Sequence, residues 1–385
     1  MKILIGLVGR FHSVELCKGF ISLSLKPKII TTIPRFIMKK HLDNKYFISI
    51  GILGLINHFR FIFGKRIGSL INIYVHKIFS TLLIKEINTY DLLITWCGSS
   101  LELYKFITLK KNLKKKITIL ECGSTHILHK IKVLKRIYRQ NNFKFIVNKD
   151  FIKRELEEYK LAKYVVVPSN YAKKTFKNFG INENKIFVNP YGVDKKVFYI
   201  DNFYTQQEKK IKILFCGNAS LRKGFHLLID ASKYFSNMNI QLIHIGTIER
   251  EIRSYMCKKN INSFIFLGPK KQRELFKFYN QVDALILPSL EEGLALVQLQ
   301  SLACGTPIIS SYQAGVDDIM KNSSLYLGEK IKIVSKEGIV DSINLFLKNK
   351  KNVQRKAISQ YCEKNFSIET YTWRYQKFIN DKLNK

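Results

Sequence analysis

Two adjacent carboxylates in the segment 288–307 have the chemistry to bind hydroxyl groups. Glu291 and Glu292 follow an apolar run, Asp283–Leu287, and precede a leucine-rich segment that stops at a Gly-Thr-Pro turn. This order predicts a strand, an acidic loop, a short helix and a further strand. The loop would then face a helix N-terminus at the carboxyl end of a strand, where open α/β sheets bind ligands. The alternative is an ordinary crossover with polar loop residues, but loops at this edge usually carry function.

A second candidate loop, Gly217 to Gly224, joins a buried strand to a predicted helix and contains Arg222 and Lys223. Two positive charges beside helix N–H groups suit a diphosphate, which arginine can bind through two hydrogen bonds. A solvated basic loop is the alternative in so basic a chain. Together with the acidic loop, however, the site offers cations for phosphates and acceptors for hydroxyls. This combination favours a nucleotide-sugar pocket over a nucleic-acid groove, where carboxylates would repel the backbone.

The first half of the chain contains loops of the same kind. The apolar strands expected at 91–96 and 117–120 both end in Cys-Gly-Ser, so their loops should lie side by side at the carboxyl edge of a sheet. Glycine at such an edge lets the backbone approach a ligand closely. His126 stands on the second of these loops.

Strands and helices alternate along both halves, which predicts two parallel α/β domains with a ligand cleft between their carboxyl edges. We expect an N-terminal domain over 1–190, a linker over 191–210, a C-terminal domain over 211–365, and a C-terminal helix over 366–385 that could pack back on the N-terminal domain. The strands predicted elsewhere are at 1–8, 28–32, 164–167, 185–188, 211–216, 240–245 and 264–267.

The formal net charge is +36, from 65 basic and 29 acidic side chains. Such a charge is typical of proteins that bind nucleic acid or anionic membranes. The basic residues are spread along the whole chain, with one local cluster over 110–116, and no nucleic-acid-binding motif accompanies them. As the explanation of the net charge we therefore favour general compositional drift, followed by binding to a membrane surface and then by binding to nucleic acid.

The seven cysteines are widely spaced and contain no Cys-x-x-Cys pair, which favours buried thiols in a reducing compartment. The first apolar run, Ile3–Val8, is too short for a signal peptide and is typical of a buried strand. The stretch Tyr46–Gly64 is the most lipid-like, but polar residues interrupt it and leave no clean 18-residue span. It could be an interfacial segment, or a buried helix plus a loop.

Three segments resemble the family 4 retaining glycosyltransferases of the GT-B fold, also called glycosyl transferases group 1. They are VVVPSNYAKKTFKNFGINENKIFVNPYGVD (165–194), ILFCGNASLRKGFHLLIDA (213–231) and LILPSLEEGLALVQLQSLACGTPIIS (285–310). They are similar to the linker, diphosphate and sugar/ribose motifs of that family, in the same order. Two weaker pieces, GRFHS (9–13) and CGSTHI (122–127), resemble one branch of it. The resemblance implies two Rossmann-like domains that face each other across a cleft.

The resemblance also implies roles for individual residues. Lys223, with Arg222 beside it, matches the basic position that holds the donor diphosphate. Glu292 matches the first acid of a Glu-x7-Glu motif, which hydrogen-bonds the transferred sugar. Gln300 stands at the second acid, which binds ribose; its amide oxygen can still accept a hydrogen bond, without the charge. The other donor-binding residues implied are Gly217, Asn218, Gly293, Leu294, Ala295, Leu296, Pro269 and Lys270.

On the N-terminal side, His126 matches a catalytic histidine that faces the sugar across the cleft, and a histidine bonded within its own loop is the alternative. Gly9, Arg10 and His12 are candidates for the acceptor side. Asn218 stands where many relatives carry arginine, so the diphosphate charge would rest more on Arg222 and Lys223.

The implied function is transfer of a sugar from a nucleotide-sugar donor to a glycan or lipid-linked acceptor, with retention at the anomeric carbon, in polysaccharide or glycoconjugate biosynthesis. No metal or other cofactor is expected, and the Asp317-Asp318 pair lacks further ligands. We expect a cytoplasmic protein, peripheral on the inner face of an anionic membrane, that does not bind nucleic acid. The alternatives are a nucleotide-sugar epimerase of the same fold, a donor-binding protein without turnover, and a basic nucleic-acid- or membrane-binding protein without transferase activity.

Overall fold

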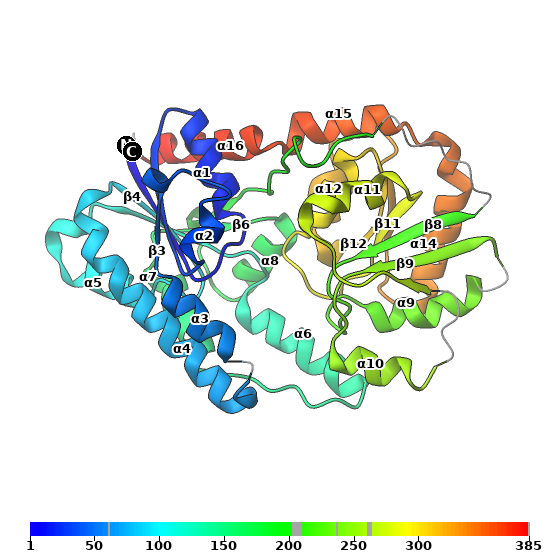
Figure 1. Cartoon of the computed structure of the whole chain (residues 1–385), viewed down its shortest axis with the longest axis horizontal. Helices are drawn as coiled ribbons and strands as arrows, with labels where there is room; N and C mark the ends of the chain where they lie inside the picture. Colours follow the sequence, from blue (N-terminus) through cyan, green and yellow to red (C-terminus); the bar gives the residue numbers. More distant parts are fainter. Residues whose placement is uncertain (61, 202–209, 236–237, 260–263, 384–385) are drawn as a thin grey trace.

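The computed structural model describes residues 1–60, 62–201, 210–235, 238–259 and 264–383. These residues form two α/β domains, each built on a parallel sheet with helices on both faces (Figure 1). The predicted fold class is therefore confirmed. The predicted linker over 191–210 includes residues 202–209, which lie outside the described part of the chain.

The N-terminal domain contains a seven-stranded sheet in the order β3-β2-β1-β4-β5-β6-β7. Its strands are β1 (Lys2–Leu7), β2 (Lys26–Thr31), β3 (Phe47–Ser49), β4 (Leu92–Trp96), β5 (Ile117–Glu121), β6 (Tyr164–Val167) and β7 (Ile186–Val188). Its helices are α1 (Ser13–Ser22), α2 (Arg35–Met38), α3 (Gly51–Phe59), α4 (Gly64–Leu83), α5 (Leu101–Leu109), α6 (Ile127–Gln140), α7 (Lys149–Leu161) and α8 (Asn170–Asn178). The central strands are apolar runs because both faces of the sheet are covered.

The C-terminal domain contains a six-stranded sheet in the order β10-β9-β8-β11-β12-β13. Its strands are β8 (Ile211–Cys216), β9 (Ile240–Ile245), β10 (Phe264–Phe266), β11 (Ala284–Leu287), β12 (Ile308–Ser311) and β13 (Gly328–Ile331). Its helices are α9 (Phe225–Ser232), α10 (Arg250–Met256), α11 (Leu275–Asn280), α12 (Leu296–Ala303), α13 (Val316–Met320), α14 (Lys336–Asn349) and α15 (Arg355–Phe366).

Both sheets reverse their strand order at one point, between β1 and β4 in the first and between β8 and β11 in the second. Leu285 of β11 pairs with Leu214 of β8, so the loops that follow these two strands emerge side by side. Ligands of open parallel sheets bind at such reversal points. The basic loop after β8 and the acidic loop after β11 are brought together in this way.

The last helix, α16 (Ile368–Leu383), returns to the N-terminal domain (Figure 1). Tyr371 and Tyr375 on this helix are buried, and both hydroxyl groups donate to Glu121 at the end of β5, at 3.2 and 2.6 Å. Phe378 stacks on Phe187 with 4.2 Å between ring centroids. The chain therefore passes between the domains twice, and α16 is part of the N-terminal domain in space.

Helix α6 lies at the opposite rim of the molecule from α16 (Figure 1). Leu134 and Ile137 on α6 are buried in one apolar cluster with Phe225 and Ile252 of the C-terminal domain. The two domains therefore also share an apolar contact at this rim.

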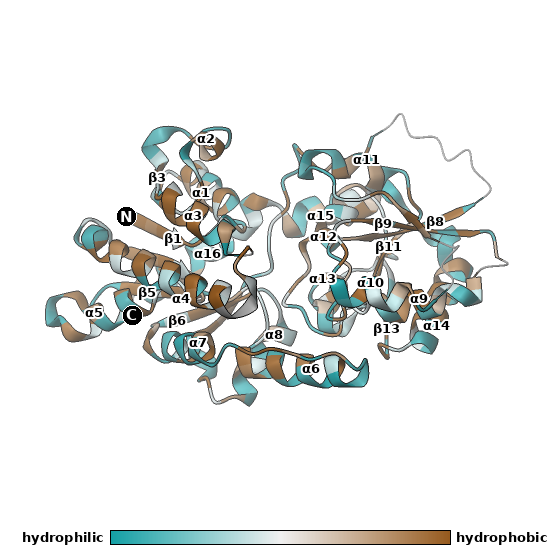
Figure 2. Ribbon diagram, turned by 60° about the horizontal axis from the view of Figure 1, so that its bottom comes forward, coloured by the Kyte–Doolittle hydropathy of each residue, from teal (hydrophilic) through white to brown (hydrophobic). Residues whose placement is uncertain are grey.

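The structure differs from expectation in the region 46–83. A buried helix plus a loop was one expectation for 46–64, but in α3 only Leu53 is buried. The stretch Ile67–Thr89 has the length and mean hydropathy, 1.5, of a membrane span, and 28% of its best window is buried. It is the one such stretch among the residues that the structure describes. Figure 2 shows that many residues along α3 and α4 are hydrophobic.

Candidate active site

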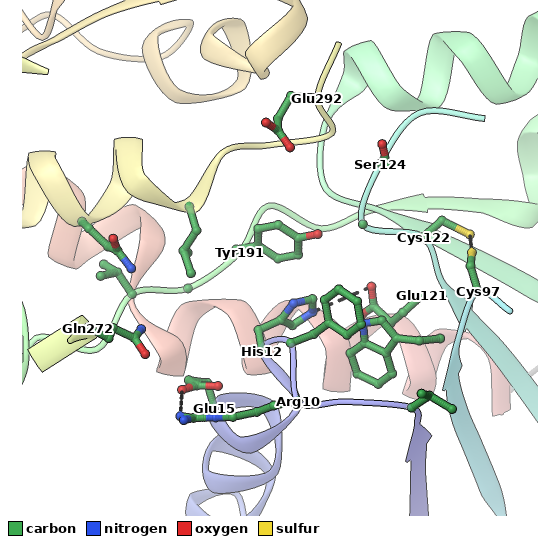
Figure 3. Close-up of a pocket in the computed structure, with 18 of the residues that line it drawn as sticks. Arg10, His12, Glu15, Cys97, Glu121, Cys122, Ser124, Tyr191, Gln272 and Glu292 are labelled. Atoms are coloured by element: carbon green, nitrogen blue, oxygen red, sulfur yellow. Dashed lines mark hydrogen bonds and ion pairs between the residues drawn. The ribbon is translucent and has the colours of Figure 1, made fainter. Parts of the chain in front are cut away.

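A cavity of about 1260 Å³ lies between the two domains. Its walls come from the loops after β1, β4, β5, β8 and β11, and from α3, α4 and α7. Figure 3 shows Arg10, His12, Glu121, Tyr191 and Glu292 around it. Among the predicted site residues, those that line this cavity are Arg10, His12, Arg222, Glu292, Leu296 and Gln300. The reversal points of both sheets therefore open into one interdomain cleft.

The acidic and basic loops of the C-terminal domain meet directly in this cleft. Glu292 lies 3.0 Å from Arg222 Nη1 and 3.2 Å from Lys223 Nζ. Burial would raise the pKa of Glu292, but the charges of Lys223 and Arg222 outweigh burial and lower this pKa from 4.5 to about 2. Glu292 is therefore ionised, and it occupies the cations that would bind a diphosphate.

The other carboxylate of the pair, Glu291, links the two domains. Its side chain is completely buried and accepts hydrogen bonds from Ser124 Oγ at 2.7 Å and Thr125 Oγ1 at 2.6 Å, across the cleft. Arg222 Nη1 donates to the Glu291 carbonyl oxygen at 2.9 Å. The sequence suggests that Glu291 binds hydroxyl groups, and the family resemblance assigns it no role because only Glu292 has the spacing to position 300. Its contacts with Ser124 and Thr125 depend on the arrangement of the two domains.

The domains also touch through backbone beside this carboxylate. A Cβ atom on Gly293 would lie 2.4 Å from the carbonyl oxygen of Gly123 in the N-terminal domain. Ser169 Oγ donates to the Gly293 carbonyl oxygen at 2.6 Å. Gly293 is therefore needed for close approach of the domains, which is a different reason from the ligand contact expected of it.

Gln300 on α12 is buried, and its amide oxygen accepts a hydrogen bond from Tyr279 at 3.0 Å. The second lone pair of this oxygen remains available, because an amide oxygen accepts two hydrogen bonds. Gln300 lies at the cavity wall, as the position expected to hold ribose should.

Several residues expected to bind the donor do not line the cavity. Asn218 donates to Glu249 at 2.6 Å and accepts from Thr247 at 2.8 Å, so its amide is used within the domain. Gly217 lies beneath Lys223, whose Nζ would be 3.4 Å from a Cβ on this glycine. The others absent from the cavity wall are Lys223, Gly293, Leu294, Ala295, Pro269 and Lys270; Lys223 is tied to the wall through its ion pair with Glu292. The loop after β10 instead lines the cavity with Lys271, Gln272 and Arg273, just beyond the expected pair.

His126 does not face the cleft. Its side chain is buried, stacks on Phe179 with 4.7 Å between centroids, and caps α6 by accepting from the backbone N–H of Leu128 at 3.3 Å. Burial lowers the pKa of His126 to about 4. The structure therefore places this histidine within its own loop, which was the alternative, and not across from a sugar.

The loop after β1 lines the acceptor side of the cavity through Arg10 and His12. Arg10 pairs with Glu15 at 3.2 Å and with His41 at 3.0 Å. The His12 ring lies 4.3 Å from the Tyr191 ring, and its Nε2 is 4.0 Å from Glu121 (Figure 3). Gly9 does not line the cavity; it shapes the turn, with φ of +93°.

The two Cys-Gly-Ser loops lie side by side, as predicted. Cys97 Sγ and Cys122 Sγ are 2.7 Å apart at the cleft wall. Burial raises the pKa of Cys122 to about 11, so this thiol is protonated at neutral pH. All seven cysteines are free, and five are buried.

The residues that the structure describes contain no group of three or more His, Cys, Asp or Glu side chains placed to hold a metal ion. Asp317 pairs with Lys330, and Asp318 accepts from the backbone N–H of Asn170 at 2.9 Å. Both carboxylates of this pair therefore serve protein contacts.

Sequence reasoning missed the wall of the cavity formed by α3 and α4. Asn57, Arg60, Asn72 and His76 line it, and Arg60 Nη1 donates to Asn57 at 2.8 Å and also to Asn72. The polar residues that interrupt the lipid-like stretch were the available signal. In the sequence these polar residues argue against a membrane span, and they do not by themselves indicate the lining of a site.

Comparison with known proteins assigns residues 200–365 to the family described as glycosyl transferases group 1. The uncharacterized glycosyltransferase MJ1178 of Methanocaldococcus jannaschii is 30% identical over 36% of this chain and 37% of its own length. An uncharacterized 41.2 kDa protein from the cps region of Klebsiella pneumoniae is 26% identical over 64% of this chain and 72% of its own length. The match thus spans little more than a third of the first relative.

Solved structures match the whole chain. Anabaena HepE, in complex with UDP and glucose, has a TM-score of 0.67 at 14% identity, covering 99% of this chain and all of that one. The lipopolysaccharide outer core galactosyltransferase WaaB, in its apo form, has a TM-score of 0.64 at 17% identity, over 99% and 100%. At these identities the likeness shows the fold alone.

Proposed function

We propose that this chain, whose residues 200–365 match the family described as glycosyl transferases group 1, transfers a sugar from a nucleotide-sugar donor to a glycan or lipid-linked acceptor, with retention of anomeric configuration. The observation that carries the proposal is the cluster of Glu292 with Arg222 and Lys223, in which Glu292 and Arg222 line the interdomain cleft. The bound UDP and glucose named for the HepE structure support a nucleotide-sugar donor.

The roles follow from charge and position. The donor diphosphate would replace Glu292 as the partner of Arg222 and Lys223, and these cations would stabilise negative charge as the diphosphate leaves. Glu292, released from them, would accept hydrogen bonds from the sugar hydroxyls. The sugar would gain oxocarbenium character as its bond to the diphosphate lengthens. Gln300 and the loop 271–273 are placed to contact the nucleoside part.

We also propose that two protein cations take over charge neutralisation, so that no metal is required. EDTA should then leave the transfer rate unchanged, and loss of activity that Mg²⁺ or Mn²⁺ restores would contradict this. Relatives include a capsular polysaccharide biosynthesis glycosyltransferase, CapM of Staphylococcus aureus, which supports a role in polysaccharide biosynthesis. We propose in addition that the protein acts on the cytoplasmic side of a membrane.

A screen of nucleotide sugars by mass spectrometry, with Glu292→Ala as the blank, tests the function. We expect one donor to be consumed by the wild-type protein and not by the variant, with a mass increase on the acceptor. If a nucleotide sugar changes configuration without an acceptor and without mass change, the protein is an epimerase. If no nucleotide sugar or nucleotide diphosphate binds at all, the proposed function is wrong.

A further inference from the structure

Helices α3 and α4 expose an unusual amount of apolar surface. Ten large side chains on or between them are each 45–72% exposed: Ile52, Leu55, Ile56, Phe59, Ile62, Phe63, Ile67, Leu70, Tyr74 and Ile78. We call this set the α3–α4 ridge. Figure 2 shows the two helices as adjacent apolar elements at one side of the N-terminal domain. An apolar patch of this size on a soluble domain marks a surface that docks on something else.

Helix α4 is anchored in the domain on its other face. Val75, Phe79 and Leu83 are buried in one apolar cluster with Leu4 of β1 and Leu93 of β4. Unless this core is broken, α4 cannot leave the domain to cross a bilayer. Its geometry instead suits a helix that lies in the plane of a membrane surface with one face immersed.

The charge around the ridge identifies its occupant. Residues 51–83 include four Lys or Arg and no Asp or Glu, and residues 127–149 include seven and none. Asn148 donates a hydrogen bond to Ser69, so the end of the second segment lies beside α4. Exposed apolar side chains in segments that contain basic but no acidic residues suit an anionic bilayer. A second copy of the chain would bring like charges together, which disfavours a dimer through this face.

The same helices form a wall of the interdomain cavity. Asn57 lies on α3 and Arg60 directly follows this helix. Asn72 and His76 lie on α4, and all four residues line the cavity. A lipid that rests against the ridge would therefore carry its head group to the cleft beside Arg60. A guanidinium group is well suited to hold a phosphate there.

We propose that the α3–α4 ridge seats the protein on an anionic bilayer, and that the acceptor is a lipid-linked phosphate whose head group enters the cleft past Arg60. This inference rests on the proposed glycosyltransferase function and names the class of its acceptor.

Vesicle sedimentation tests the ridge. The full-length protein should bind vesicles that contain phosphatidylglycerol, and bind vesicles of phosphatidylcholine alone much less. Phe59→Asp with Phe63→Asp should lower the partition coefficient by at least about tenfold, because two large apolar side chains no longer leave water. The matched control, Ile333→Asp with Leu345→Asp, adds the same charge on exposed positions of the C-terminal domain. Equal losses in both variants, or self-association of the wild type without vesicle binding, would overturn the proposal.

Tryptophan fluorescence tests the acceptor class. Trp96 lines the cavity, and in a Trp373→Phe protein it is the only tryptophan. Farnesyl phosphate should change its fluorescence at lower concentration than farnesol, and Arg60→Gln should weaken the phosphate response about tenfold. Equal responses to both compounds would refute a lipid phosphate. Calorimetry with nucleoside diphosphates tests the proposed function separately. Absence of binding in that experiment contradicts the proposed function, whereas absence of binding to vesicles or to farnesyl phosphate contradicts only this inference.

Discussion

At the scale of single residues, the proposed function gives Glu292 two roles: it would bind the sugar, and it would compete with the diphosphate for the same cations. It is ionised and lies between Arg222 and Lys223. Binding of a donor must therefore exchange one anion for another on the same two cations. Substitutions that remove the carboxylate charge and substitutions that remove a cation should have opposite effects on diphosphate affinity.

We predict that Glu292→Gln binds a free nucleoside diphosphate at least as tightly as the wild type, yet transfers sugar about 100-fold more slowly. Lys223→Ala should weaken diphosphate binding about tenfold or more, because a charge-assisted hydrogen bond is lost. Calorimetry and a transfer assay measure the two effects. Glu183→Gln, which removes a half-exposed carboxylate paired with Lys173 and Lys177, is the control. Weaker diphosphate binding in Glu292→Gln would contradict the competition.

The same cluster should influence acid stability. The pKa of Glu292 is lowered from 4.5 to about 2, so its ion pairs stabilise the fold above about pH 4.5. This contribution is lost as pH falls from there through about 2, since the folded state must then take up the proton. Urea unfolding from pH 7 to pH 2 should show wild type more stable than Glu292→Gln at neutral pH, with the difference shrinking below pH 4.5. A constant difference would exclude this explanation.

We predict that the substitution Gln300→Glu raises the affinity for a ribonucleoside diphosphate. The hydroxyl of Tyr279 can donate to either side chain, and a carboxylate accepts from ribose more strongly than an amide. The affinity for a ribonucleoside diphosphate should rise about fivefold, with no rise for the dideoxy analogue. Equal changes for both analogues would show that position 300 does not contact ribose.

The residues show where sequence reasoning succeeds. Glu292, Arg222 and Lys223 were predicted to share a site because they follow strands that end at one edge, and the structure joins them. His126 was placed by a motif, and the motif cannot show that Phe176, Phe179 and Tyr159 surround the ring. Glu291 was missed because its partners are about 167 residues away in the other domain.

At the scale of elements, the predicted strands were those rich in apolar residues, and β3 and β13 were not predicted. β13 was missed because its sequence, GEKI, has no such run: Glu329 is buried while Lys330 is exposed. The prediction of a buried helix within 46–64 was wrong for a related reason. Apolar residues predict burial in general, but α3 exposes its own, and only the lack of a covering element in the fold reveals this.

The loop before α12 yields a prediction of its own. Gly293→Ala would place a methyl group 2.4 Å from the Gly123 carbonyl oxygen and force the domains apart there. Transfer should fall about 100-fold, because misplacement by about 1 Å is that costly. Diphosphate binding to the C-terminal domain should remain. Gly180→Asn, at an exposed glycine with φ of +83° and open space around it, is the control. Normal transfer in Gly293→Ala would show that close domain contact is not required.

At the scale of the whole molecule, α16 packs on the N-terminal domain, where Tyr375 contacts Glu121. We predict that Tyr375→Phe lowers the free energy of unfolding by about 1–3 kcal/mol, since a buried hydroxyl no longer donates to the Glu121 carboxylate. Tyr361→Phe removes a hydroxyl that donates to the carbonyl of Ile319 at 2.7 Å, and this neutral hydrogen bond should cost less. Urea unfolding measures both. A loss in Tyr375→Phe no larger than in the control would contradict the role given to Glu121.

The contact of α6 with the C-terminal domain has a thermal consequence. Opening the cleft at that rim would expose Leu134 and Ile137 to water. Closure would then be accompanied by a negative change in heat capacity, as apolar burial is. Near room temperature the driving force of such burial is entropic, and it weakens on cooling. The protein should therefore spend more time open in the cold. The rate of the proposed transfer would then fall on cooling more steeply than the chemical step alone dictates.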